Sequence, residues 1–178
     1  MPKLIPDVEK KLIDSARHIL MTEGPDALSM RRVAGECGIA VGTLYNYFES
    51  KDLLIAKITV ADWQDELQKM NELADSATDF TAGFSSLYTL LSDFVGAHRP
   101  SWIGTGQTSS YQSFSNSYRS MLVDQICGFI TKLMQSTRSD NLLPLAKLLA
   151  ETMLSTAARG DEYKESMYIL AETLRKEV

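Results

Sequence analysis

Residues 29–51 read SMRRVAGECGIAVGTLYNYFESK and decide the fold of the N-terminal part of the chain. The segment predicts two short helices joined by a tight turn at Gly38, followed by the start of another helix. Ser29 suits the N-cap of the first of these helices, which we expect to end near Cys37. The second should cover about 41–47. This spacing is typical of a helix-turn-helix, a motif that places its second helix in the major groove of DNA.

The charge of the chain is unevenly distributed. Its formal net charge is −5 over 178 residues, which taken whole argues against a nucleic-acid-binding protein, because such domains are often basic. Residues 1–57 hold eight Lys or Arg and eight Asp or Glu, whereas 58–178 hold ten basic and fifteen acidic side chains. The acidity therefore belongs to the second part, and a DNA-binding role for the first part stays open.

The spacing of apolar residues predicts an all-α chain. Apolar positions recur every three or four residues, and no stretch alternates as a strand would. Around the motif we expect a first helix from Pro6 to Gly24, a long fourth helix over 51–73 and a fifth over 80–97. Residues 98–113, rich in Ser, Thr and Gly, predict a long loop. Further helices are expected at 114–135, 141–159 and 162–176, about nine in all.

This pattern predicts two domains and a cytoplasmic protein. We expect a helix-turn-helix domain at 1–52, joined through the long fourth helix to a helical domain at 53–178. No apolar run is long enough to span a membrane, and no core of signal-peptide length is evident. Cys37 and Cys127 do not suggest a disulfide scaffold, which fits a reducing compartment.

The motif region resembles the DNA-binding domain of the TetR (tetracycline-repressor) family over about the first 55 residues. The resemblance rests on "TEGPDALSM" at 22–30 and "RRVAGECGIAVGTLYNYFESKDLL" at 31–54. The matching positions are Ser29, Ala34, Gly38, Gly42-Thr43-Leu44-Tyr45, Phe48 and Ser50-Lys51-Asp52-Leu53-Leu54. Ala40 departs from the pattern, because the family often has Ser or Thr there as the cap of the recognition helix. Alanine has no oxygen for this cap, a loss of roughly 1 kcal/mol.

The predicted DNA contacts lie in both helices of the motif and at the start of the next helix. They are Ser29, Arg31, Arg32, Val41, Gly42, Thr43, Tyr45, Tyr47 and Lys51. Small residues allow the backbone to approach the bases, whereas hydroxyls, cations and helix N-termini suit phosphates. Alternatively, the two tyrosines pack against the first helix. The two arginines lie about 100° apart on their helix, so only one can face a phosphate squarely.

The resemblance implies that the second domain binds a small effector and forms a homodimer through its last two helices. The interface candidates are Leu145, Leu149, Met153, Met167, Leu170 and Leu174. The candidates for the effector pocket are aromatic and methionine residues: Trp63, Phe84, Tyr88, Trp102, Tyr111, Tyr118, Met121, Phe129 and Met153. The alternative for both sets is an ordinary core, since apolar residues at helical spacing usually pack inside.

The sequence therefore predicts a DNA-binding regulator, with repression of a palindromic operator relieved by a small molecule as the expected output. The alternative is a helical interaction protein that is impaired in DNA binding or responds to redox state. An enzyme is not expected, because His18 and His98 are isolated and no phosphate-binding glycine loop is present. No cofactor and no metal site are predicted.

Overall fold

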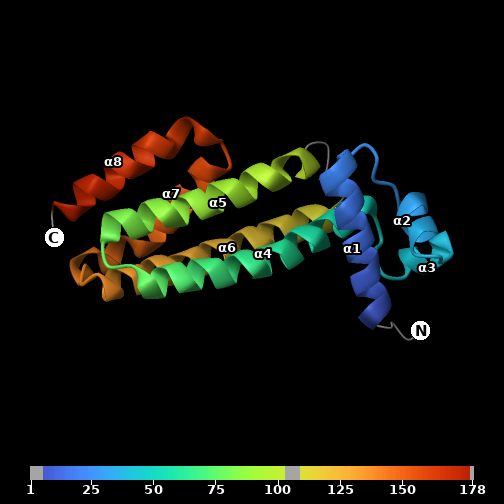
Figure 1. Cartoon of the computed structure of the whole chain (residues 1–178), viewed down its shortest axis with the longest axis horizontal. Helices are drawn as coiled ribbons and strands as arrows, with labels where there is room; N and C mark the ends of the chain where they lie inside the picture. Colours follow the sequence, from blue (N-terminus) through green and yellow to red (C-terminus); the bar gives the residue numbers. More distant parts are fainter. Residues whose placement is uncertain (1–5, 103–108, 177–178) are drawn as a thin grey trace. The chain divides into compact units, whose positions relative to one another are not determined.

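The computed structural model describes residues 6–102 and 109–176, with side chains except at positions 6, 100–102, 109–116 and 161. Helices are the regular secondary structure of this part of the chain and no strand occurs in it, which confirms the all-α prediction (Figure 1). Eight α-helices and two short 3-10 helices replace the nine or so expected. They are α1 (Pro6–Glu23), α2 (Met30–Glu36), α3 (Val41–Tyr45), α4 (Lys51–Ser76), α5 (Phe80–Trp102), α6 (Ser109–Ser136), η1 (Asp140–Leu145), α7 (Ala146–Ala157), η2 (Asp161–Tyr163) and α8 (Lys164–Arg175).

The chain divides into two compact units. Unit 1 comprises Met1–Trp63 and Pro100–Gln112, and unit 2 comprises Gln64–Arg99 and Ser113–Val178. The long helix α4 contributes to both units. The division at 52/53 expected from the sequence falls near the start of this helix instead of at the boundary between the units.

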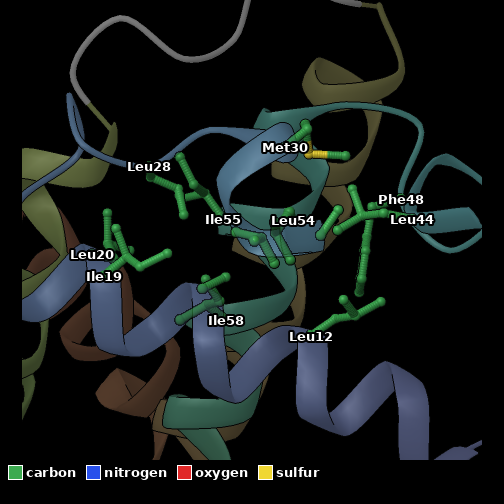
Figure 2. Close-up of a cluster of buried hydrophobic side chains, with 13 residues drawn as sticks. Leu12, Ile19, Leu20, Leu28, Met30, Leu44, Phe48, Leu54, Ile55 and Ile58 are labelled. Atoms are coloured by element: carbon green, nitrogen blue, oxygen red, sulfur yellow. The ribbon is translucent and has the colours of Figure 1, made fainter. Parts of the chain in front are cut away.

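The core of unit 1 collects the apolar faces of α1, α2, α3 and the first turns of α4 (Figure 2). Its fully buried members include Leu12, Ala16, Ile19, Val33, Ala34, Leu44, Leu54 and Ile58. Helix α1 begins at a proline, whose fixed φ suits the first helical position, and Asp7 and Glu9 complement the helix dipole there. It gives way to Gly24 at φ +87°, the left-handed conformation that glycine adopts without strain. The local signals therefore set the first helix as predicted.

Unit 2 is built from the remainder of α4 and the helices α5 to α8. Helices α5 and α6 approach each other closely at Gly83, where a Cβ atom would lie 2.4 Å from Leu133 Cδ1. The hydroxyl of Thr81 donates to the carbonyl of Ala171 at 3.5 Å, which joins α5 to α8. None of the helices in the described ranges is long and apolar enough to cross a membrane.

The expected long loop at 98–113 is the largest error in the predicted fold. Helix α5 continues to Trp102 and α6 begins at Ser109, so most of this stretch is helical. The end of α5 is held by one contact distant in sequence and by one within the helix. Arg99 donates to the carbonyl of Ala158 at 2.6 Å, and His98 is buried with its ring 4.6 Å from that of Phe94. These contacts outweigh the loop-like composition.

The expected helix at 141–159 is divided in the structure. Residues Asp140–Leu145 form the 3-10 helix η1, and the α-helix begins only at Ala146. Pro144 explains the division, because its ring lacks an N–H donor and disfavours α-helical geometry at the residue before it. The predicted break at Gly160 is confirmed, with φ +108°.

Candidate nucleic-acid interface

The turn of the helix-turn-helix forms as the sequence predicts. Gly38 has φ +68°, and the amide of Ile39 donates to the carbonyl of Ala34 at 3.0 Å across the end of α2. This arrangement is the glycine-terminated helix end that satisfies carbonyls left without partners in the last turn. At the other end of α2, the Ser29 hydroxyl oxygen accepts from the amide of Arg32 at 3.2 Å. Both ends of α2 are thus fixed by local interactions.

Helix α3 has one buried face and one exposed face. Leu44 is completely buried and Phe48, just beyond the helix, is nearly so, which anchors α3 on the core. Gly42, Thr43 and Tyr45 are exposed, and Tyr45 retains 49% of its accessible surface. The outward face of α3 is therefore free to meet a partner.

The remaining predicted contacts of α3 are less exposed. Val41 and Tyr47 are half-buried, and both pack against the core of unit 1. The Tyr47 ring lies 6.5 Å from that of Phe48. The packing alternative considered for the tyrosines thus describes Tyr47 and not Tyr45.

Asn46 is an exposed residue of this face that the sequence analysis omitted. It lies three positions after Thr43, a spacing that places both side chains on the same side of a helix. Its amide can donate to and accept from adenine, which makes it a further candidate for base recognition. The polar residues at three-residue spacing were the signal that could have identified it.

Ala40 is the N-cap of α3 and makes no side-chain hydrogen bond there. Its backbone is extended, with φ −67° and ψ 142°, a conformation that serine also adopts in N-caps. We expect Ala40→Ser to raise the free energy of unfolding by about 1 kcal/mol, because the hydroxyl can accept an amide of the first turn. Thermal unfolding followed by circular dichroism measures the change. Ala40→Val, which offers no oxygen, is the control, and equal melting temperatures for the two variants would contradict the expectation.

Arg31 and Arg32 differ in exposure and in the ion pairs that they form. Arg31 is exposed. The Arg32 guanidinium is paired with two carboxylates, those of Glu23 and Glu36. The hydrogen bond from Arg32 holds the pKa of the Glu23 carboxyl below its ordinary value, and the same bond raises the pKa of Arg32. Arg32 is therefore not available to a phosphate unless these pairs break.

Lys51 also has a partner within the chain. Its ammonium donates to the carbonyl of Pro25 at 2.6 Å and is partly buried. The helix that it begins is capped by Ser50, whose hydroxyl oxygen accepts from the amide of Leu53 at 3.2 Å. Lys51 thus connects the start of α4 to the link between α1 and α2.

The predicted pocket residues differ widely in burial. Trp63, Phe84, Tyr88, Phe129 and Met153 are buried, Tyr118 is half-buried, Met121 is exposed, and the side chains of Trp102 and Tyr111 lie outside the described residues. Phe129 and Met153 border an apolar gap in unit 2 with no room for a water molecule. A larger space, about 470 Å³, is an open groove between α5 and α8. It is lined by Ser85, Tyr88, Thr89, Lys164, Glu165, Met167 and Tyr168.

The predicted dimer-interface residues lie mainly on the inner side of their helices. Leu149, Met153 and Met167 are buried within unit 2, whereas Leu145, Leu170 and Leu174 are half-buried. The exposed large apolar side chains of α7 and α8 are Leu148 at 63%, Tyr168 at 52% and Ile169 at 57%. None of these three is among the interface candidates chosen from the sequence, which follow the apolar stripe with helical period.

Within the described residues no group of three or more His, Cys, Asp or Glu side chains is placed to hold a metal ion. Cys37 and Cys127 are free, half-buried thiols in different units.

Comparison with known proteins supports the interpretation of the motif. Residues 12–58 match the family described as "Bacterial regulatory proteins, tetR family". The HTH-type transcriptional regulator UidR of Escherichia coli K12 is 34% identical over 62 residues. The matched segment covers 35% of this chain and 32% of UidR, so the similarity to this curated relative spans about a third of its length.

Two solved structures resemble the whole chain. A transcriptional regulator from Cytophaga hutchinsonii has 18% identity and a TM-score of 0.68, with 94% of this chain and 96% of that one covered. FadR from Bacillus subtilis, solved in complex with stearoyl-CoA, has 14% identity and a TM-score of 0.56, with 93% and 94% covered. At these identities the similarity to solved structures establishes the fold alone. The match to the family of regulatory proteins rests on residues 12–58.

Proposed function

We propose that this chain is a DNA-binding regulator of the TetR family, which represses transcription as a homodimer that a small-molecule effector releases from a palindromic operator. The observation that carries the proposal is the two-sided helix α3. Its inner face is anchored by Leu44, and its outer face presents Gly42, Thr43 and Tyr45. This is the arrangement that a recognition helix needs in order to enter the major groove as a rigid unit.

Each outward residue has a distinct role in the proposed DNA contact. Gly42 lets the backbone approach the DNA closely, because it has no side chain. The Thr43 hydroxyl can hydrogen-bond a base edge, and its methyl can contact a thymine methyl. Tyr45 reaches furthest and places its hydroxyl on a base edge or a phosphate. Because the outward face of α3 combines close backbone approach with side chains that can hydrogen-bond base edges, we expect sequence-specific binding to DNA.

The proposed homodimer uses the exposed apolar side chains of the last two helices. Leu148 on α7 and both Tyr168 and Ile169 on α8 are more than half exposed in the single chain. Covering such residues removes apolar surface from water, at about 25 cal/mol per Å². A dimer with two-fold symmetry would present two copies of α3 to successive major grooves, about 34 Å apart.

The proposed effector site is the groove between α5 and α8. Its volume of about 470 Å³ falls within the range typical of ligand pockets, unlike the apolar gap beside Met153. Ser85 and Tyr88 line this groove, and their hydroxyl oxygens are buried without a hydrogen-bond partner in the described part of the chain. Buried polar atoms usually have partners, so a ligand that supplies them would gain binding energy.

Release from DNA requires that the effector favour one conformation of the protein over another. Helix α4 is the proposed route of coupling, because it runs without a break through residues of both units. A coupling free energy of about 1–3 kcal/mol between the two sites is typical of such systems. The action of the protein is then binding and release of DNA in the cytoplasm, and not catalysis, in line with relatives that are named as regulators.

Selection from a pool of random double-stranded DNA tests this function. We expect repeated rounds of capture on the full-length protein to enrich an inverted repeat whose half-sites match the spacing of a dimer. Enrichment of a single unrepeated site would contradict the dimeric mode of binding. Failure to enrich any sequence over the starting pool would contradict sequence-specific recognition itself.

A further inference from the structure

We propose that Arg32 is a positioning residue of the DNA-binding motif, which holds α2 in place against α1 without contacting DNA. Arg31, its neighbour, is then the arginine of α2 that meets the phosphate backbone. The inference rests on the proposed recognition of DNA through α2 and α3. It assigns different roles to two adjacent residues of the same type.

The guanidinium of Arg32 is fixed on both sides. Its two terminal nitrogens donate to the two carboxylate oxygens of Glu23, at 2.9 and 2.5 Å. Its Nε donates to Glu36 at 3.2 Å. The first pair is a bidentate fork, a geometry that arginine forms with carboxylates and lysine cannot. All three nitrogens of the guanidinium are therefore engaged within unit 1.

The carboxylates of Glu23 and Glu36 lie at helix C-termini, where a negative charge is unfavourable. Glu23 is the last residue of α1, and Glu36 is the last residue of α2. The C-terminal end of a helix carries a partial negative charge, so a carboxylate there is unfavourable unless a cation neutralises it. Arg32 neutralises both ends at once, and in doing so fixes the end of α1 relative to α2.

A second contact extends this network to the middle of α1. The Ser15 hydroxyl donates to Glu36 at 2.8 Å, through the carboxylate oxygen that Arg32 does not use. The network of Ser15, Glu23, Arg32 and Glu36 thus joins α2 to α1 at two separated points. Isolated surface ion pairs contribute little, but bidentate pairs joined in a network are the exception. The orientation of α2 relative to α1 is therefore set partly by Arg32.

Arg31 makes no comparable contact. Its side chain is exposed, and among the described residues no hydrogen bond or ion pair holds it. It lies about 100° around the helix from Arg32, so the two cannot face the same surface. The backbone of Arg32 also serves the start of α2, because its amide donates to the Ser29 cap. The geometry leaves Arg31 as the free cation of this helix.

The salt dependence of operator binding separates the two roles. Four variants of the full-length protein are compared on the selected operator: Arg32→Gln, Arg32→Lys, Arg31→Gln and Arg31→Lys. We expect both Arg32 variants to weaken operator binding by roughly fivefold at fixed salt, which corresponds to the upper end of the energies typical of surface ion pairs. The slope of log affinity against log salt should stay at its wild-type value in both variants. Arg31→Gln should reduce the magnitude of that slope by about 0.9, as loss of one phosphate contact does, and Arg31→Lys should preserve it.

Three results would overturn the inference. One is a reduced slope for Arg32→Gln that Arg32→Lys restores, which would make Arg32 a phosphate contact. Another is unchanged operator affinity in both Arg32 variants. The third is an operator affinity of the Arg32 variants that falls only in proportion to the fraction of unfolded protein measured by circular dichroism. Arg32 would then contribute to stability alone and not to the position of α2. Wild-type protein that binds no operator would instead contradict the proposed function, so the two failures are distinguishable.

Discussion

Replacing Ile169 with glutamate is expected to separate the dimer into monomers and to weaken operator binding by roughly 100-fold or more. Ile169 lies on α8 and exposes 57% of its surface in the single chain, so the new carboxylate is tolerated in the monomer. In a dimer the same group would be buried at an apolar contact, where an unpaired charge is costly. The loss in DNA affinity follows because two linked recognition helices bind far more tightly than one.

Sedimentation and fluorescence anisotropy measure the two parts of this prediction. Wild-type protein should sediment at twice the chain mass of 19.8 kDa, and Ile169→Glu at the chain mass itself. The control is Met21→Glu, which places the same charge on an exposed apolar residue of α1 and should leave the dimer intact. If Ile169→Glu and Leu148→Glu both remain dimeric, the interface lies elsewhere.

Leu44→Ala is expected mainly to lower stability, whereas Tyr45→Ala is expected mainly to weaken DNA recognition. Leu44 is fully buried beneath α3, so its truncation should lower the free energy of unfolding by roughly 2–5 kcal/mol. Tyr45, the next residue, is 49% exposed, and its truncation should change stability by no more than about 0.5 kcal/mol. Its loss should still weaken operator binding by roughly 10- to 100-fold, the range for one lost base contact.

Thermal unfolding and operator titration of the same samples test this contrast. Tyr45→Phe shows how much of the effect belongs to the hydroxyl, since it retains the ring. A Tyr45→Ala protein that binds the operator as wild type does would remove Tyr45 from the interface. A Leu44→Ala protein as stable as wild type would show that α3 is not anchored as the structure places it.

Local chemistry made the helices of unit 1 predictable from sequence. Gly24, Gly38 and Gly160 each end a helix with positive φ, and Ser29 caps α2 with its hydroxyl. These features depend only on neighbouring residues, so their residue types were sufficient. The uncapped start of α3 at Ala40 followed from the same reasoning.

Contacts between residues distant in sequence account for features that the sequence pattern did not indicate. The stretch at 98–113 has the composition of a loop, yet Arg99 is held by a carbonyl 59 positions away. Arg32 was expected to face DNA, but its partner Glu23 lies across a turn, in another helix. For the dimer, helical periodicity identifies the face that a helix buries in its own domain. The sequence therefore pointed to Met153, which is buried, and not to Ile169, which is exposed, because an outward apolar residue has no periodic signal of its own.

Fluorescence anisotropy of the protein on its selected operator and on a scrambled duplex of equal length, across about 50–200 mM salt, tests the central claim most directly. We expect the operator to be bound at least roughly 10³-fold more tightly than the scrambled duplex, with log affinity falling linearly with log salt. Equal affinity for the two duplexes at every salt concentration would contradict it, because helix α3 would then read no sequence.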